Sequence, residues 1–357
     1  MIIQINGKTI RLNPRRLIGQ GGEAEVYDIG KNRVAKVFKP PNHPDYKTCS
    51  QAQAQAEQRL QTHQKKLPSF PTHLPDRVIA PIDLAYDDRQ QIIGYTMPKL
   101  TQVEPLLKYG DRTFRQGIDH QQVVRIFQDL HDTLSKLHFA GIIIGDFNDL
   151  NILVRDHQAY LIDADSWQFG SFLCAMFTAK FVDPTLCDRQ ASQPMLIKPH
   201  SEQSDWYAFA LMLFQSLLFV DPFGGLYKPK DPSQKVPQAA RSLHGITVFH
   251  PDVKYPKPAL CYRYLPDELL HQFQQIFGGD RREEFPRALL DQLHWQTCPS
   301  CGTNHARPTC PDCTPSQPGQ VVSVTVVQGQ VTATRVLETR GIIAVSYTHL
   351  RAHETRR

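Results

Sequence analysis

The sequence predicts an α+β fold in which a small antiparallel sheet precedes a larger, mainly helical region. Apolar and polar residues alternate along 2–12 and 15–39 around Gly and Asn turns, a pattern typical of short antiparallel strands. After Leu106 the apolar residues recur at helical spacing, most clearly over 121–139 and 204–219. Strands that precede helices, rather than alternating with them, favour the α+β class.

The segment between these two regions should add one helix and two strands. Residues 48–66 are rich in Gln, Ala, Glu, Lys and Arg and lack Gly and Pro, so they should form a helix that Pro68 ends. Ile79–Leu84 and Gln91–Met97 are predicted as strands joined by a turn at 87–88.

Size and composition favour one main domain with a small appendage. The chain has 357 residues, of which 41% are hydrophobic, and single cores stop growing near about 250–300 residues. The net charge of +5 is slight and the basic residues are dispersed, so neither nucleic acid nor a membrane surface is indicated as a partner. The chain lacks an apolar run of the ~20 residues that a spanning helix needs and a signal-peptide layout, so we expect a soluble cytoplasmic protein.

A glycine-rich turn and a lysine follow one another in the strand region. Gly19, Gly21 and Gly22 stand in the run IGQGGEAEVY, where missing side chains let backbone amides approach phosphate oxygens. An ordinary glycine-rich hairpin explains this run equally well. Lys36 lies in the next strand between apolar residues and can pair with phosphates, although alone it also fits a surface lysine. Glu57, the sole acid of the predicted helix, suits an ion pair with that lysine or a solvated helix face.

The most specific signal is a pair of acid-bearing loops beside short apolar runs. Residues 137–154 read LHFAGIIIGDFNDLNILV, and residues 160–165 read YLIDAD. The two runs resemble the catalytic and magnesium-binding loops of the protein-kinase superfamily, in a divergent bacterial form. The resemblance implies that Asp146 accepts the proton of the substrate hydroxyl and that Asn151 and Asp163 hold Mg²⁺ or Mn²⁺ against the phosphates of ATP.

The resemblance covers 10–293 and implies a two-lobed kinase fold with a small β lobe, an αC helix and a larger helical lobe. Lys36 is then catalytic together with Asp146, Asn151 and Asp163. The residues implied to bind the nucleotide are Gly19, Gly21, Gly22, Val26, Lys36, Glu57, Met97 and Lys99.

Two later stretches indicate the substrate class. TAKFVDP at 178–184 resembles the end of a protein-kinase activation segment, and SDWYAF at 204–209 resembles the helix that anchors it. Small-molecule kinases of related fold usually lack both features. The resemblance therefore implies a protein kinase with a protein substrate, and Thr178 favours a Ser/Thr hydroxyl over Tyr.

Four departures from the family pattern put full activity in question. Gly145 stands where the family has an arginine, so activation by loop phosphorylation is not expected, and Asn148 replaces a lysine at the γ-phosphate. Asp163-Ala164-Asp165 replaces Asp-Phe-Gly, and Ala24 replaces the third loop glycine. Loss of one charge stabiliser costs about 10²–10³ in rate, which predicts slow turnover.

Two alternatives therefore stay open beside the protein kinase. One is a pseudokinase that binds nucleotide and acts as a signalling scaffold, and the other is a small-molecule phosphotransferase. Retention of Lys36, Asp146, Asn151 and Asp163 together favours chemistry.

A four-cysteine zinc ribbon is predicted over 296–315. Cys298, Cys301, Cys310 and Cys313 form two CxxC pairs that can surround one tetrahedral Zn²⁺. A redox CxxC pair is the competing interpretation. Four sulfur ligands leave no open position, so the site should be structural, and the ribbon offers a surface on which a protein partner can dock. We expect 316–343 to be a linker and the start of a truncated β-rich segment, and 344–357 to be a non-native tail.

Overall fold

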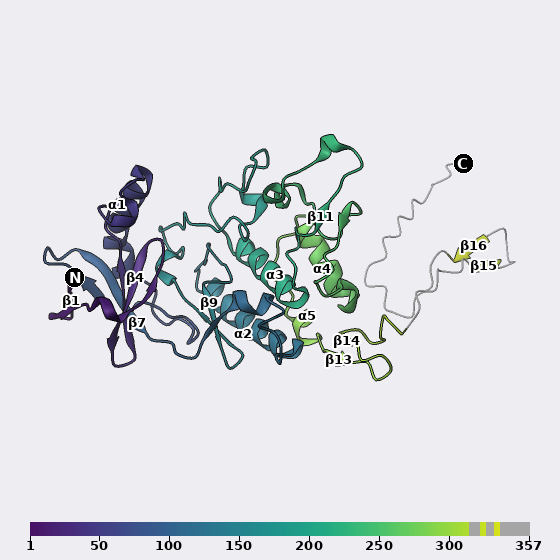
Figure 1. Cartoon of the computed structure of the whole chain (residues 1–357), viewed down its shortest axis with the longest axis horizontal. Coiled ribbons are helices and arrows are strands. Elements are labelled where there is room, and N and C mark those ends of the chain that lie inside the picture. Colours follow the sequence, from purple (N-terminus) through teal and green to yellow (C-terminus); the bar gives the residue numbers. More distant parts are fainter. Residues whose placement is uncertain (314–321, 326–331, 336–357) are drawn as a thin grey trace, which may run out of the picture. The chain divides into compact units, whose positions relative to one another are not determined.

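The structure is a computed structural model that describes residues 1–313, 322–325 and 332–335 (Figure 1). The chain divides into two compact units, Met1–Cys261 with Phe273–Leu293, and Tyr262–Gln272 with His294–Arg357. Within the described residues, every helix is too short or too polar to cross a membrane. The predicted linker and tail lie outside the described residues, apart from two short strands.

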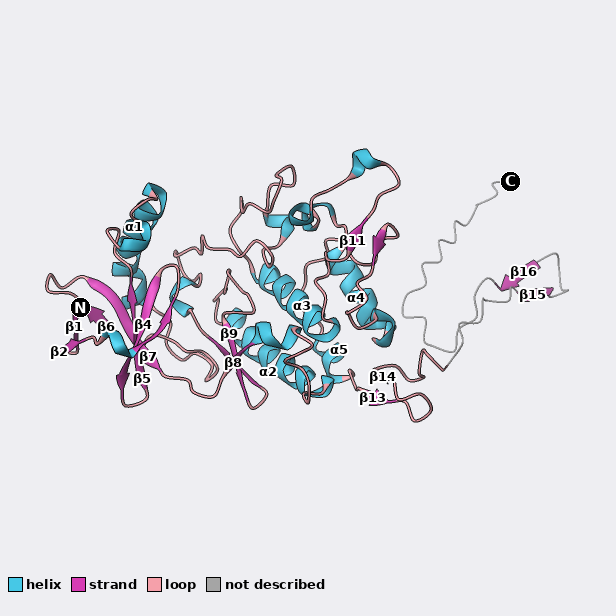
Figure 2. Cartoon of the chain, in the orientation of Figure 1, coloured by secondary structure: helices cyan, strands magenta, loops and turns pink. Residues whose placement is uncertain are grey.

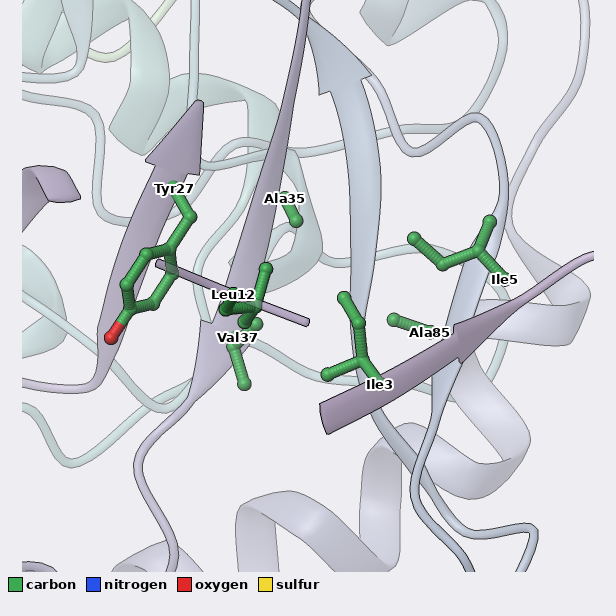
Figure 3. Close-up of a cluster of buried hydrophobic side chains, with 7 residues drawn as sticks. All are labelled: Ile3, Ile5, Leu12, Tyr27, Ala35, Val37 and Ala85. Carbon is green, nitrogen blue, oxygen red and sulfur yellow. The ribbon is translucent and has the colours of Figure 1, made fainter. Parts of the chain in front are cut away.

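The first unit opens with a seven-stranded antiparallel sheet in the order β2-β1-β6-β7-β5-β4-β3. Its strands are β1 Ile2–Ile5, β2 Lys8–Arg11, β3 Leu17–Gln20, β4 Ala24–Gly30, β5 Arg33–Phe38, β6 Leu84–Tyr86 and β7 Ile92–Pro98 (Figure 2). Figure 3 shows a buried cluster that joins Ile3 and Ile5 of β1 to Tyr27 of β4 and to Ala35 and Val37 of β5. Because β6 and β7 separate β1 from β5 in the sheet, these contacts require the sheet to curl.

Lys36 lies on the face of the sheet opposite to this cluster. Side chains alternate between the two faces of a strand, so Lys36 and Phe38 point away from Ala35 and Val37. Phe38 packs there with Ala24, Tyr95 and Leu67, which directly follows helix α1 Ser50–Lys66. The predicted helix over 48–66 is thus confirmed.

Two expectations for this region need correction. The strand predicted over Ile79–Leu84 is β6, which begins only at Leu84, since the segment before it contains Pro81, which has no amide hydrogen for a strand ladder. Strands β1 and β2 also belong to the sheet, so the sheet begins before residue 10, where the kinase-like domain was predicted to start.

The rest of the first unit contains few helices, which are joined by long loops and short strands, so it is less helical than expected. Its helices are α2 His120–Phe139, α3 Glu202–Leu218, the C-terminal part of α4 Asp267–Phe277, and α5 Arg287–Asp291. Capping explains where two of them begin: Asp119 accepts a hydrogen bond from the Gln122 amide, and Ser201 does the same for Ser204. Most of α3 is buried, which fits its apolar residues on all sides. The short strands are β8 Glu104–Pro105, β9 Ile152–Arg155, β10 Gln158–Leu161, β11 Leu226–Tyr227 and β12 Val253–Lys254.

The second unit contains two strand pairs. Strand β13 Gln296–Thr297 pairs with β14 Asn304–His305, and β15 Val322–Thr325 pairs with β16 Thr332–Arg335. The second pair lies within 316–343, where the start of a β-rich segment is expected.

Candidate functional site

The glycine-rich turn between β3 and β4 is closed by the Gly21 amide, which donates to the Ala24 carbonyl at 2.9 Å. Lys39 Nζ and the Tyr46 hydroxyl hold the carbonyls of Gly21 and Gly22, each at 2.6 Å. A Cβ added at Gly21 would come no closer than 3.8 Å to any neighbour, and one at Gly22 would meet nothing within 4 Å. The fold itself therefore does not demand glycine here, and the turn leaves room for a ligand to approach its backbone.

Lys36 of β5 is buried and forms ion pairs with two carboxylates. The residue is 8% exposed, and its ammonium donates to Asp163 Oδ1 and, at 2.6 Å, to Asp165 Oδ1. Burial alone would lower the pKa of Lys36, but the two carboxylates raise it well above its ordinary value. Gly94 makes this packing possible, because a Cβ there would lie 2.1 Å from the Lys36 carbonyl oxygen.

Asp163 and Asp165 lie in the short segment after β10. Asp163 has a left-handed backbone with φ of 65°, a strained conformation that is often found at functional sites. Asp165 is buried and also accepts a 2.5 Å hydrogen bond from the Tyr95 hydroxyl. Burial opposes its ionisation, but the Lys36 charge, the nearby His63 and the hydrogen bonds from Lys36 and Tyr95 together lower the pKa of Asp165 to about 2.

Glu57 does not take the place expected of it. It is exposed on α1, and the acids that pair with Lys36 among the described residues are Asp163 and Asp165. The helix turns Arg59 inward instead, where Nη1 pairs with Glu23 Oε1 of the glycine-rich turn at 2.8 Å. The predicted ion pair between Glu57 and Lys36 is therefore corrected, because Glu57 lies on the solvent side of the helix.

The other predicted nucleotide contacts have separate positions. Val26 of β4 is the cross-strand neighbour of Lys36, which places it on the same face of the sheet. Met97 of β7 packs at the edge of the cluster formed by Phe38 and Tyr95. Lys99 is engaged elsewhere, since its ammonium pairs with Asp28 Oδ2 at 2.7 Å.

A continuous set of contacts joins Lys36 to Asp146. Lys36 contacts Asp163, and the amide of the preceding residue, Ile162, donates to the Asn151 carbonyl at 3.0 Å. The Asn151 side chain donates from Nδ2 to the Asp146 carbonyl at 3.2 Å. The four residues predicted as catalytic therefore form one connected group.

Asn148 braces the loop between Asp146 and Asn151. Its Oδ1 accepts from the amides of Leu150 and Asn151, at 3.0 and 3.2 Å. Its Nδ2 donates to the Asp146 carbonyl at 3.0 Å and to Thr178 Oγ1 at 3.3 Å. Asn148 therefore fixes the geometry of the loop but brings no positive charge.

Asp205 of α3 anchors the residues that precede Asp146, and it is completely buried. Asp205 Oδ2 accepts from the Ile144 amide at 2.8 Å, and Oδ1 accepts from the Gly145 amide at 2.9 Å. Gly145 has φ of +79°, and a Cβ there would lie 2.8 Å from Cys174. No arginine side chain can be accommodated at this position without displacing Cys174, which explains the departure noted in the sequence.

Contacts at two points anchor the segment from Asp163 to Pro184. The backbones of Ile143 and Gln168 exchange two hydrogen bonds of 2.9 and 2.8 Å. Near the end of the segment, Arg282 donates to both carboxylate oxygens of buried Asp183, at 2.7 and 2.9 Å.

The four cysteines of the second unit converge, with all sulfur atoms within 4.8 Å of one another. Cys298 and Cys313 are 3.6 Å apart, as are Cys301 and Cys310. Four sulfurs at about 2.3 Å from one tetrahedral Zn²⁺ would be separated by about 3.8 Å, so the cluster fits that ion. Hydrogen bonds with Cys301 and Cys298 raise the pKa of Cys313 to about 12, whereas hydrogen bonds from Thr303 lower the pKa of Cys301 to about 6.

Comparison with known proteins agrees with this arrangement. The chain is similar to a protein kinase. It is 26% identical over 290 residues to protein kinase YegI of Escherichia coli O157:H7, a match that covers 74% of this chain and 41% of that protein. No family model matches the chain. The similarity confirms the resemblance to protein kinases that the two loops indicated, and this chain spans less than half of the relative's length.

Sequence reasoning missed two residues of this group. Asp165 stands in the sequence as a departure from the family pattern, and the signal that points to its role is an acid within an apolar stretch, which requires an internal partner when buried. Arg282 gave no local signal, because its partner Asp183 is 99 positions away in the chain.

Proposed function

We propose that this chain is an ATP-dependent protein kinase of the two-lobed kinase fold, which transfers the γ-phosphate to a Ser or Thr hydroxyl of a protein. The observation that carries this proposal is the connected group of Lys36, Asp163, Asn151 and Asp146. Phosphoryl transfer needs a cation for the phosphates, ligands for a metal and a base for the acceptor, held together rigidly.

Each residue then has a separate task. Bound ATP and Mg²⁺ would supply the transferable phosphate and the charge that offsets its oxygens. Lys36 would bind the α- and β-phosphates, while the open backbone of Gly21 and Gly22 receives the phosphate chain. Asp163 and the side-chain oxygen of Asn151 are hard oxygen donors of the kind that Mg²⁺ prefers. Asp146 would accept the proton of the attacking hydroxyl.

A protein acceptor is favoured over a small molecule by the surface next to Asp146. The Thr178 hydroxyl donates to Asp146 Oδ1 at 2.8 Å. A cavity of about 300 Å³ is lined in part by Ala179 and Lys180, the two residues that follow Thr178, and by Phe223. A cavity lined by this segment can receive a side chain of an extended polypeptide.

A pseudokinase is the second candidate, and Asn148 is the observation that favours it. Both ends of its side chain are bonded within the loop, to the Asp146 carbonyl and the Leu150 amide, where the family pattern has a lysine. A chain without that cation would bind nucleotide and transfer phosphate slowly or not at all.

Incubation of the purified chain with γ-labelled ATP, Mg²⁺ or Mn²⁺ and a generic protein substrate tests the proposal. We expect label on Ser or Thr, in the substrate or in the chain itself. Label on Tyr would refute the Ser/Thr assignment. ATP binding without any transfer would favour the pseudokinase. Transfer to small alcohols alone would favour the small-molecule phosphotransferase.

A further inference from the structure

The side of α1 that faces the protein interior carries basic residues. The kinase pattern would instead place an acid on this helix, as the partner of Lys36. Arg59 lies largely inside with its side chain 12% exposed, and His63 and Lys66 are 4% and 3% exposed. Lys66 Nζ lies 5.6 Å from the centre of the Phe169 ring, and the centres of the His63 and Phe38 rings are 4.4 Å apart. The inward side of α1 thus offers the cations Arg59 and Lys66 and a neutral histidine, and leaves the acid Glu57 in solvent.

Lys36 instead has two acidic partners that differ in burial. The Asp163 side chain is 37% exposed, whereas that of Asp165 is 5% exposed. Asp165 Oδ1 receives both the Lys36 ammonium at 2.6 Å and the Tyr95 hydroxyl at 2.5 Å. Tyr95 and Lys36 are cross-strand neighbours in β7 and β5, so the sheet fixes these two groups, and both donate to Asp165.

We propose that Asp165 is the positioning residue that holds Lys36 at the phosphates, in place of an acid from α1. This inference rests on the proposed kinase function. Asp163 is also the proposed metal ligand, whereas Asp165 has Lys36 and Tyr95 as its hydrogen-bond donors, so Asp165 would remain the buried counter-ion of Lys36 when a metal ion is bound. A buried lysine that lacked this partner would be costly to keep charged, and its ammonium would leave the site.

These contacts determine which parts of the site a movement of α1 can affect. Arg59 ties α1 to the glycine-rich turn through Glu23, while Lys36 is held without α1. Movement of the helix would therefore affect the turn and leave the lysine in place.

The test compares Asp165→Asn with Glu57→Gln, a matched loss of an acid at an exposed position. Binding of ATP and of adenosine to each variant is measured by calorimetry with Mg²⁺ present. We expect Asp165→Asn to weaken ATP binding about tenfold or more and to leave adenosine binding within about twofold, because only the phosphates need Lys36. Glu57→Gln should match the wild type for both ligands. Equal behaviour of the two variants, or equal weakening of ATP and adenosine, would overturn the inference.

A rescue separates positioning from folding. The double variant Asp165→Gly, His63→Glu removes the acid at position 165 and places one on α1, at the position that packs against Phe38. ATP binding by this double variant should return to within about threefold of the wild type. If Asp165→Asn does not fold, this double variant carries the test: it should fold and bind ATP, and a folded double variant that binds only adenosine would contradict the inference. A wild type that binds no ATP would instead refute the proposed function.

Discussion

The Thr178 hydroxyl donates a 2.8 Å hydrogen bond to Oδ1 of Asp146. The bond joins the segment that we expect to face the acceptor to the residue that we expect to take its proton. It also directs Oδ1 towards the protein, so that Oδ2 is the oxygen expected to act as the base.

Thr178→Val should lower the rate of phosphate transfer about tenfold, since one hydrogen bond that orients the base is worth about 1–1.5 kcal/mol. Thr178→Ser keeps the hydroxyl and should retain most of the rate. Thr62→Val, on the exposed side of α1, is the control and should change nothing. Transfer rates at saturating ATP measure the effect, and a Thr178→Ser variant as slow as Thr178→Val would exclude a role for the hydroxyl.

The ion pair of Arg282 with Asp183 should matter for stability. The two side chains are 11% and 2% exposed, so Arg282→Ala leaves a buried carboxylate without its partner and should cost about 3–5 kcal/mol. Arg189→Ala breaks a pair whose side chains are 52% and 44% exposed and should cost less than about 1 kcal/mol. Urea unfolding of both variants provides the comparison, and similar losses would argue against a special role for Arg282.

His63 should make the fold sensitive to acid. Burial lowers its pKa to about 4 in the folded state, whereas an unfolded chain titrates near about 6.5. Between these values only the unfolded state binds the proton, so about 3 kcal/mol of stability present at neutral pH is lost as the pH falls from about 6.5 to about 4. His63→Gln should flatten the dependence of Tm on pH in this window, and His244→Gln, at an exposed position, should not. An unchanged slope for His63→Gln would contradict the burial argument.

The cysteine cluster should bind one Zn²⁺ that the second unit needs and phosphate transfer does not. A short segment with little apolar surface gains its stability from metal ligation, so a chelator should unfold it while Mg²⁺ is kept in excess. Cys301→Ser should lower the zinc content well below one per chain, whereas Cys49→Ser, an exposed cysteine outside the cluster, should not. Metal analysis of the purified variants measures this, and disulfides formed under reducing conditions would refute the zinc site.

Local patterns predicted much of this structure. The alternation along 2–39 and the helical spacing over 121–139 and 204–219 correspond to β1–β5, α2 and α3, because periodicity reports which face of an element is buried. The four cysteines were predictable for a similar reason, since metal ligation leaves a fixed spacing in the sequence.

The sequence did not reveal the contacts that depend on tertiary packing, in which residues far apart in the chain come together. Glu57 and Arg59 are two positions apart in the same helix, so composition favours neither, and only packing decides that Arg59 faces inward. Asp165 could not be matched to Lys36 because its partner lies 129 positions away. The resemblance to protein kinases implies an acid on the helix, whereas in this chain the acids that pair with Lys36 come from the segment after β10.

The most direct test of the account measures ATP affinity and γ-phosphate transfer together in the wild type, Asp146→Asn and Asp163→Asn. Both positions lie in the connected group, yet the account gives them different tasks. Asp146→Asn should keep ATP affinity within about threefold and lose about 10²–10⁴ in transfer rate, since only base chemistry is removed. Asp163→Asn should lose the Mg²⁺-dependent part of ATP affinity as well as transfer. Transfer that survives in Asp146→Asn, or an equal loss of ATP affinity in both variants, would contradict the account.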